Sequence, residues 1–280
     1  MRHFFLTLLI LAFGSTQAQV QTPQPSPSAT LTQTVGLTEF NVMYSRPSMK
    51  GREIFGKLVA YDQLWRTGAN KNTIISFDDT IVFGEQEVEA GEYAIFTIPN
   101  EGRWDIFLYS NTENWGVPQE WDENLIAAKT TVEVSKLSEA VESFTIDFGH
   151  FTKDSAHLII TWENTSAHIL VEVPSDRKVM ASIENAMKDP KPNDYFSAAV
   201  YFMETDRDIN KARVWVDKAM EAQEKKPYWM LRQQSLIYAK AGEKQQAIKI
   251  AKQSLEAAEK AGNRDYVNMN KASLKEWGAY

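Results

Sequence analysis

The pattern of apolar residues changes once along the chain, near Pro174, and this change limits the folds that are open to it. Before Pro174, short segments alternate apolar and polar residues, as half-buried strands do. After Pro174, apolar residues recur at the spacing of amphipathic helices. Strands followed by helices in separate runs are typical of separate domains. We therefore expect an all-β domain over residues 29–175 and an all-α domain over residues 176–280.

The first domain shows nine short segments rich in β-branched and aromatic residues. Turn residues separate them, among them Asp78-Asp79 and Asn164-Thr165. Many short strands at this spacing indicate a sandwich or a barrel, and we predict a β-sandwich. The expected strands are residues 37–44, 73–77, 80–83, 93–98, 104–109, 127–134, 144–148, 157–162 and 168–173.

The second domain contains six segments with helical periodicity, and Asp194 and Asn263 are expected as N-caps. Three small residues recur 35 positions later, as shown by Ala212, Val216 and Ala219 against Ala247, Ala251 and Ser254. This spacing resembles tetratricopeptide hairpins, so we expect an all-α, tetratricopeptide-like array; an unrelated helical bundle is the alternative. The expected helices are residues 176–188, 194–205, 209–224, 228–241, 243–260 and 264–277.

Residues 1–18 have the features of a secretory signal peptide. Arg2 precedes an apolar stretch, and Thr16-Gln17-Ala18 offers a small-residue cleavage site; a buried N-terminal helix is the alternative. Residues 19–28 are polar and rich in proline, which predicts a flexible lead-in. We expect a periplasmic or secreted protein with no transmembrane segment in its mature form. The chain has no cysteine, which excludes disulfides and thiol chemistry.

Charge is divided unevenly between the two domains. Residues 19–175 carry 10 Lys and Arg against 22 Asp and Glu, a net charge of −12, whereas residues 176–280 carry 19 against 15, a net charge of +4. So acidic a first domain makes nucleic acid an unsuitable partner. Six of its ten basic residues nevertheless fall within residues 46–71. This local reversal of sign marks residues 44–70 as the candidate site.

The candidate site combines cations with aromatic and amide side chains. Arginine offers a rigid fork of donors to a carboxylate or phosphate, and a flat ring suits a sugar. An anionic or glycan ligand is therefore one hypothesis. The alternative is that the arginines pair with acidic residues of the same domain and hold its loops. The candidate ligand-binding residues are Tyr44, Arg46, Lys50, Arg52, Trp65, Arg66 and Asn70.

Motifs of known chemistry are missing from the sequence. It has no Gly-x-Ser-x-Gly and no phosphate-binding glycine loop, so no catalytic residue is assigned. His157 and His168 flank an expected hairpin and could oppose each other, but a metal needs a third ligand. We expect no metal and no cofactor. Trp104 and Trp162 are expected in the core, and Trp115 and Trp121 are candidates for an exposed rim.

Several short motifs occur in order: Tyr44-Ser-Arg-Pro47, Ile54-Phe-Gly56, Trp65-Arg-Thr-Gly-Ala-Asn70, Ala90-Gly-Glu-Tyr93 and Phe96-Thr-Ile-Pro99. With these motifs, residues 28–174 resemble the bacterial family called domain of unknown function 2911. The resemblance implies export, a β architecture and often a helical-repeat tail. It transfers no activity and no catalytic residue. Lys71-Asn72 departs from the family, where an acidic residue is expected after Asn70.

Together these features predict a non-catalytic binding or interaction module of the bacterial cell envelope. The helical domain is expected to take a protein or peptide partner. The alternative is an envelope enzyme, or a carbohydrate- or anion-binding protein, that acts through the basic residues 44–70.

Export can be tested on the native product. Cleavage after Ala18 should give a mature chain that begins at Gln19, so its mass should be lower by the first 18 residues. Mass spectrometry of the periplasmic or secreted fraction measures this directly. An intact N-terminus recovered from the cytoplasmic fraction would contradict the expectation.

Overall fold

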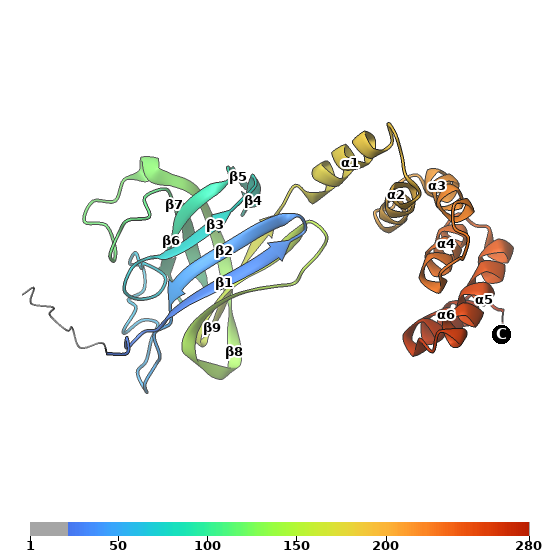
Figure 1. Cartoon of the computed structure of the whole chain (residues 1–280). Helices are drawn as coiled ribbons and strands as arrows, with labels where there is room; N and C mark the ends of the chain where they lie inside the picture. Colours follow the sequence, from blue (N-terminus) through green and yellow to red (C-terminus); the bar gives the residue numbers. More distant parts are fainter. Residues whose placement is uncertain (1–21, 280) are drawn as a thin grey trace, which may run out of the picture. The chain divides into compact units, whose positions relative to one another are not determined.

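The structure, a computed structural model, describes residues 22–279 of the chain. They form two compact units, one ending at Pro174 and the other starting at Ser175 (Figure 1). The predicted signal peptide lies outside the described residues. No helix within residues 22–279 combines the length and the apolar character needed to cross a bilayer.

The first unit contains nine strands joined in one antiparallel arrangement, which confirms the all-β prediction. Their order is β1-β2-β3-β6-β7-β8-β9-β4-β5. The strands are β1 (Ser28–Val35), β2 (Thr38–Ser45), β3 (Thr73–Phe77), β4 (Ile81–Phe83), β5 (Gln86–Val88), β6 (Gly91–Pro99), β7 (Arg103–Tyr109), β8 (Ile126–Gly149) and β9 (Ser155–Glu172).

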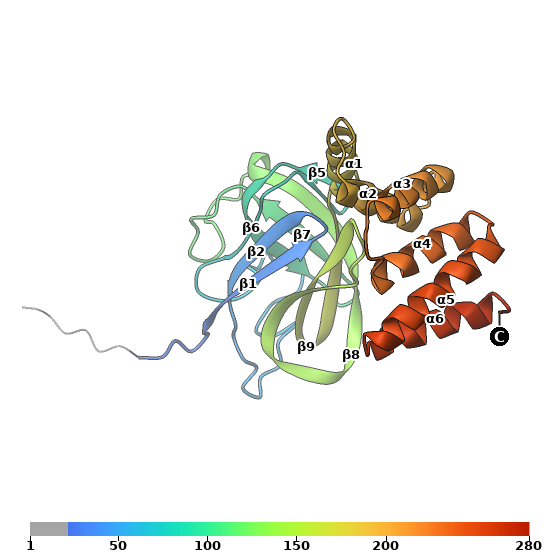
Figure 2. The ribbon, with the colours of Figure 1, turned by 45° about the vertical axis from the view of Figure 1, so that its right-hand side comes forward.

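The strands β8 and β9 are long, and each contributes to both layers of the sandwich. The first part of β8 pairs with β7, where Val132 lies opposite Trp104, and its last part pairs with β9, where Phe148 lies opposite Leu158. The register of β8 against β9 shifts twice between these parts. Figure 2 shows the two strands bending together at this point. The bend folds the sheet over, so the apolar faces of its two parts meet.

Four expected strands prove to be halves of these two long ones. Residues 127–134 and 144–148 both belong to β8, and residues 157–162 and 168–173 largely to β9. The turn predicted at Asn164-Thr165 is wrong, because β9 continues through it and bends instead. The hydroxyl oxygens of Thr161 and Ser166 lie 3.4 Å apart across that bend. A bend and a turn use similar polar residues, so the sequence pattern did not separate them.

Two strands were not predicted, β1 and β5. In β1, partly buried residues such as Leu31 alternate with exposed polar ones, which gives a weak apolar signal. Ser28 already belongs to β1, and Pro27 accepts a hydrogen bond from the Arg46 N–H at 2.8 Å. This end of the predicted flexible lead-in is therefore held against the domain.

The core of the first unit lies between the two layers. On β9, Leu158, Ile160 and Trp162 are buried and the residues between them are half-buried, as the period of a strand requires. Trp104 is fully buried, so its expected core position is confirmed together with that of Trp162. Each buried side chain of this size contributes about 1.5–3 kcal/mol relative to an exposed one.

The second unit contains six helices that form antiparallel hairpins, which confirms the predicted helical domain. The residues of the 35-position repeat, such as Ala212 and Ala247, are fully buried and allow the paired helices to approach closely. The helices are α1 (Ser175–Ala186), α2 (Pro192–Glu204), α3 (Ile209–Glu221), α4 (Tyr228–Lys240), α5 (Lys244–Lys260) and α6 (Arg264–Glu276).

Side chains at the helix ends follow capping rules, with one correction. Asn263 is the N-cap of α6, and its side chain accepts from the Tyr266 N–H at 3.1 Å, as predicted. Asp194 is not the N-cap of α2. It is the third helical residue and accepts from the N–H of Lys191, because Pro192 starts the helix two residues earlier than expected.

The turn between β4 and β5 packs directly on β8, which makes Gly84 a sensitive position. A Cβ atom at Gly84 would lie 2.2 Å from the Cβ atom of Thr130, and the φ angle of +53° also disfavours other residues. We expect Gly84→Ala to lower the free energy of unfolding by about 2–4 kcal/mol. Gly102→Ala is the matched control, because nothing lies within 4 Å of a Cβ atom there. Urea denaturation of both variants measures the difference, and equal midpoints would contradict the packing.

Candidate functional site

The basic residues 44–70 connect β2 to β3 and lie against the second part of β8. The Phe144 N–H donates to the Pro47 carbonyl at 2.9 Å, and the Met49 N–H donates to the Glu142 carbonyl at 2.8 Å. These bonds continue the sheet beyond the end of β2. The segment therefore closes the sandwich along one side.

Tyr44 and Arg46 use their polar groups on β8. The Arg46 guanidinium donates to the Phe144 carbonyl at 3.1 Å and to the Thr145 hydroxyl at 2.8 Å. The buried Tyr44 hydroxyl lies 3.2 Å from both the N–H and the carbonyl oxygen of Ile146. Both side chains are thus fixed by contacts about a hundred residues away in sequence.

Arg52 and Asn70 hold the segment's own loops. The Arg52 guanidinium donates to the carbonyls of Met49 and Ser48, at 2.9 and 2.7 Å. The Asn70 amide donates to the Ser26 carbonyl at 3.2 Å. The side chain of Lys50 is exposed, and only its backbone N–H is anchored, on Glu142.

Trp65 is part of a cluster of aromatic rings in the core. Its ring stacks on Trp162 with the centroids 6.1 Å apart, and it meets Phe144 edge-on at 5.4 Å. Its indole N–H donates to the Gly68 carbonyl at 3.1 Å. The Nη1 atom of Arg66 lies 3.3 Å from the position of a Cβ atom at Gly116.

These contacts favour a structural role for most of the seven candidate residues, although Arg46 and Arg52 hold carbonyl and hydroxyl groups and not the acidic residues expected as their partners. Tyr44, Arg46 and Asn70 hold backbone groups, and Trp65 lies in the core. Arg66 keeps a buried Nε atom without a hydrogen-bond partner within residues 22–279, and Lys50 keeps a free ammonium group. An anion or glycan site at residues 44–70 stays a prediction.

The two tryptophans proposed for an exposed rim differ. Trp115 is 78% exposed, as expected. Trp121 is half-buried, and its ring stacks on Tyr109 with the centroids 4.3 Å apart, because the loop folds back over β6 and β7. Only Trp115 therefore remains available to a ligand.

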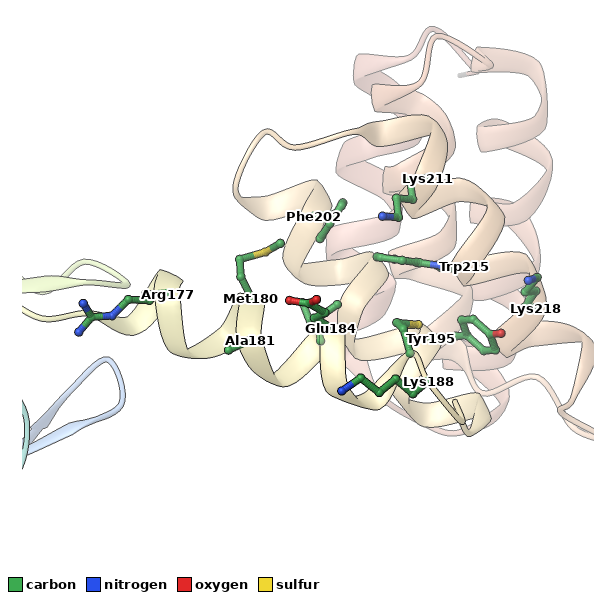
Figure 3. A pocket seen from close by; sticks show the side chains of 12 residues that line it. Arg177, Met180, Ala181, Glu184, Lys188, Tyr195, Phe202, Lys211, Trp215 and Lys218 are labelled. Atoms are coloured by element: carbon green, nitrogen blue, oxygen red, sulfur yellow. The ribbon is translucent and has the colours of Figure 1, made fainter.

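The helical unit contains a groove of about 830 Å³ between α1 and the hairpin α2–α3. Figure 3 shows the side chains of α1 facing those of α2 and α3 across this α1 groove. Methionines and an isoleucine of α1 form one wall, and aromatic rings form the other. The residues that line it are Arg177, Met180, Ala181, Ile183, Glu184, Met187, Lys188, Tyr195, Phe202, Lys211, Trp215 and Lys218.

The rim of the α1 groove is strongly basic. The Lys211 ammonium lies 4.8 Å from the ring centroid of Trp215, and that of Lys218 lies 5.0 Å from the ring of Tyr195. Neither lysine pairs with a carboxylate in the part of the chain that the structure describes. Cations over aromatic faces are attracted to them, so the lysines stay at the rim.

The α1 groove was not predicted from the sequence, although a signal for it was present. The segment 176–188 was expected as a helix, and its residues Met180, Ile183 and Met187 share one face at helical spacing. What the sequence did not show is that this face stays partly open.

Three histidines of the first unit lie together. The ring centroid of His157 is 6.2 Å from that of His168, so the two do oppose each other across the bend of β9. His150, in the loop after β8, lies 5.2 Å from His157 and 5.5 Å from His168. We call His150, His157 and His168 the histidine triad. Its third member was not foreseen, because His150 joins only through the β8–β9 connection.

A β-sandwich with its closing segment, followed by helical hairpins, defines the class of two-unit protein to which this chain belongs. A family model described as "Protein of unknown function (DUF2911)" matches residues 26–171, more than half of the chain. The chain therefore belongs to this family, which confirms the resemblance of its motifs. Comparison with curated proteins and with solved structures found no match.

The anchoring role of Arg46 can be separated from a ligand-binding role. Arg46→Ala removes two hydrogen bonds made by a charged donor to β8, so we expect a loss of about 1.5–3 kcal/mol in the free energy of unfolding. Arg52→Ala is the matched control, because its bonds are exposed and local, with an expected loss below about 1 kcal/mol.

Urea denaturation with and without added sulfate measures both effects. If Arg46 instead belonged to an anion site, Arg46→Ala would be neutral without sulfate and would abolish stabilisation by sulfate.

Proposed function

We propose that this protein is a non-catalytic binding module of the cell envelope, whose helical unit takes up an acidic segment of a partner protein in the α1 groove. The observation that carries this proposal is the composition of the groove. Four cations surround an apolar and aromatic interior, and Glu184 is the one carboxylate among the lining residues.

The shape of the α1 groove supports a peptide segment as the ligand. A volume of about 830 Å³ is within the range of sites that enclose a few side chains. Methionine side chains adapt to different apolar surfaces, and the rings of Phe202 and Trp215 provide rigid anchors. An apolar residue of the partner would enter between these walls.

The charges of the rim support an acidic partner. Within residues 22–279, Lys211 and Lys218 have no carboxylate partner of their own, so binding a carboxylate breaks no ion pair there. Because their ammonium groups already lie over aromatic rings, the two lysine side chains lose less conformational entropy when a ligand binds. Electrostatic attraction of this kind raises the association rate and makes the affinity sensitive to salt.

The proposed location rests on residues 1–18, which have the pattern of a signal peptide. An exported protein meets its partner in the periplasm or outside the cell. The alternative proposal, a carbohydrate or anion ligand at residues 44–70, has the support of Lys50 and Arg66 alone.

A peptide-display selection against the full chain tests the groove. We expect enriched peptides to carry an apolar residue flanked by Asp or Glu. Lys211→Glu and Lys218→Glu should each weaken such a peptide at least tenfold, because each reverses a charge at the rim. Lys249→Glu is the matched control, since Lys249 lies on α5, is exposed and does not line the groove. Equal loss in all three variants, or enrichment of basic peptides, would refute the proposal.

A further inference from the structure

A second cleft, of about 690 Å³, lies in the β-sandwich unit, apart from residues 44–70. It is formed by the turn between β4 and β5, the first part of β8 and both halves of β9. Polar side chains dominate its lining. The lining includes Glu85, Lys129, His157 and His168. Two members of the histidine triad thus face this cleft, and His150 stands beside both.

The imidazoles of the triad affect one another's charge. Burial, and then the charges of His150 and His157, hold the pKa of His168 below its usual value. No carboxylate contributes to this shift, so protonation of His168 is opposed by burial and by its two neighbours. The neutral form of His168 is therefore favoured until the pH falls clearly below 6.5, the ordinary value for histidine.

The other charges near the triad do not neutralise it. From the turn between β4 and β5, Glu85 lines the cleft, and from β8, Lys129 does so while bound to Asp105 of β7 at 2.9 Å. On the elements of the triad itself, the Asp147 carboxylate accepts from the N–H of Phe148 and the Asp154 carboxylate from the hydroxyl of Thr152. Lys153 lies in the same loop. Among the described residues that line the cleft, Glu85 is the carboxylate, while the ammonium group of Lys129 is already paired with Asp105.

One ring nitrogen of the triad, in His157, is able to bind a ligand. The Nδ1 atom of His157 is buried and has no hydrogen-bond partner within the described part of the chain. In a protonated imidazole both nitrogens donate, so acidification makes a hydrogen-bond donor of whichever nitrogen lacked a proton. The Nε2 atom of His168 lies 2.9 Å from the Ser166 hydroxyl, which fixes the orientation of that ring.

The arrangement does not suit a metal ion. Within residues 22–279 no three His, Cys, Asp or Glu side chains are placed to hold one. Three close imidazoles at a polar cleft instead form a site whose charge depends on protons. An oxyanion in the cleft would stabilise the charged imidazoles and accept hydrogen bonds from them.

We propose that this cleft is a proton-linked oxyanion site, in which binding of a sulfate, phosphate or carboxylate group and protonation of the histidine triad promote each other. While His168 is neutral, the cleft attracts an anion weakly. As the pH falls, each bound proton adds a charge that the other imidazoles oppose and an anion offsets. The site thus binds its ligand in acidic surroundings and releases it as the pH rises.

Isothermal titration with sodium sulfate tests this proposal, because sulfate keeps its charge between pH 5.5 and 8. Sodium chloride at matched ionic strength serves as the reference. We expect a Kd at least tenfold lower at pH 5.5 than at pH 8. We also expect net proton uptake at pH 6.5, seen as a dependence of the heat on the ionisation enthalpy of the buffer.

Variants separate the triad from the other basic groups. His157→Gln and His168→Gln should remove most of the pH dependence. His150→Gln, at an exposed position, should weaken it and guards against loss of folding in the first two. Glu85→Gln removes the opposing carboxylate and should strengthen sulfate binding. Lys249→Ala, at an exposed position on α5, is the matched control and should leave binding unchanged, whereas Lys50→Ala tests the alternative anion site at residues 44–70.

Four results would overturn the proposal. The first two are an equal Kd at both pH values and no sulfate binding at pH 5.5. The third is loss of sulfate binding in Lys50→Ala while the histidine variants still bind it. A fourth is stabilisation by Zn²⁺ or Ni²⁺ at pH 8 that every histidine variant abolishes. That outcome would replace the anion site with a metal site.

Discussion

The continuity of β8 and β9 through both layers is the constraint on which the first unit depends. Since each strand pairs along its length with partners in two layers, the bend near Thr161 and Ser166 fixes how the layers face each other. The buried rings of Trp104 and Trp162 both contact Trp65, with centroids 6.3 and 6.1 Å away, within this geometry. The bend also brings His157 close to His168, so the packing of the core and the position of the second cleft have the same origin.

Much of the architecture could be predicted because it depends on local periodicity. The helix boundaries in the second unit differ from the expected ones by at most three residues, since amphipathic spacing and caps such as Asn263 are visible in the sequence. The bend at Asn164 was taken for a turn, because polar residues favour both. The weak strand β1 was missed, since its exposed face carries threonines and its other face is mostly only partly buried.

The candidate site was harder to predict, because it depends on contacts that are distant in sequence. A run of cations at residues 46–71 does not reveal that the Arg46 guanidinium is bound to carbonyl and hydroxyl groups of β8. The unpaired lysines of the α1 groove lie in a helix of ordinary composition, and only the tertiary structure shows that Lys211 rests on Trp215. The charges in the sequence therefore indicated a candidate region for a binding site. Which cationic side chains can bind a ligand depends on the partners that the tertiary structure gives them.

The bonds that join Tyr44 and Arg46 to β8 also bear on how the chain folds. Their partners are separated by 98 to 102 residues, so closing this loop costs more chain entropy than forming any hairpin of the sheet. Contacts of such separation slow folding. During synthesis the segment after β2 emerges long before β8 and has no surface to pack against. Residues 46–72 therefore become ordered on the sandwich only after β8 has formed, and until then the apolar ring of Trp65 is open to water and to other chains.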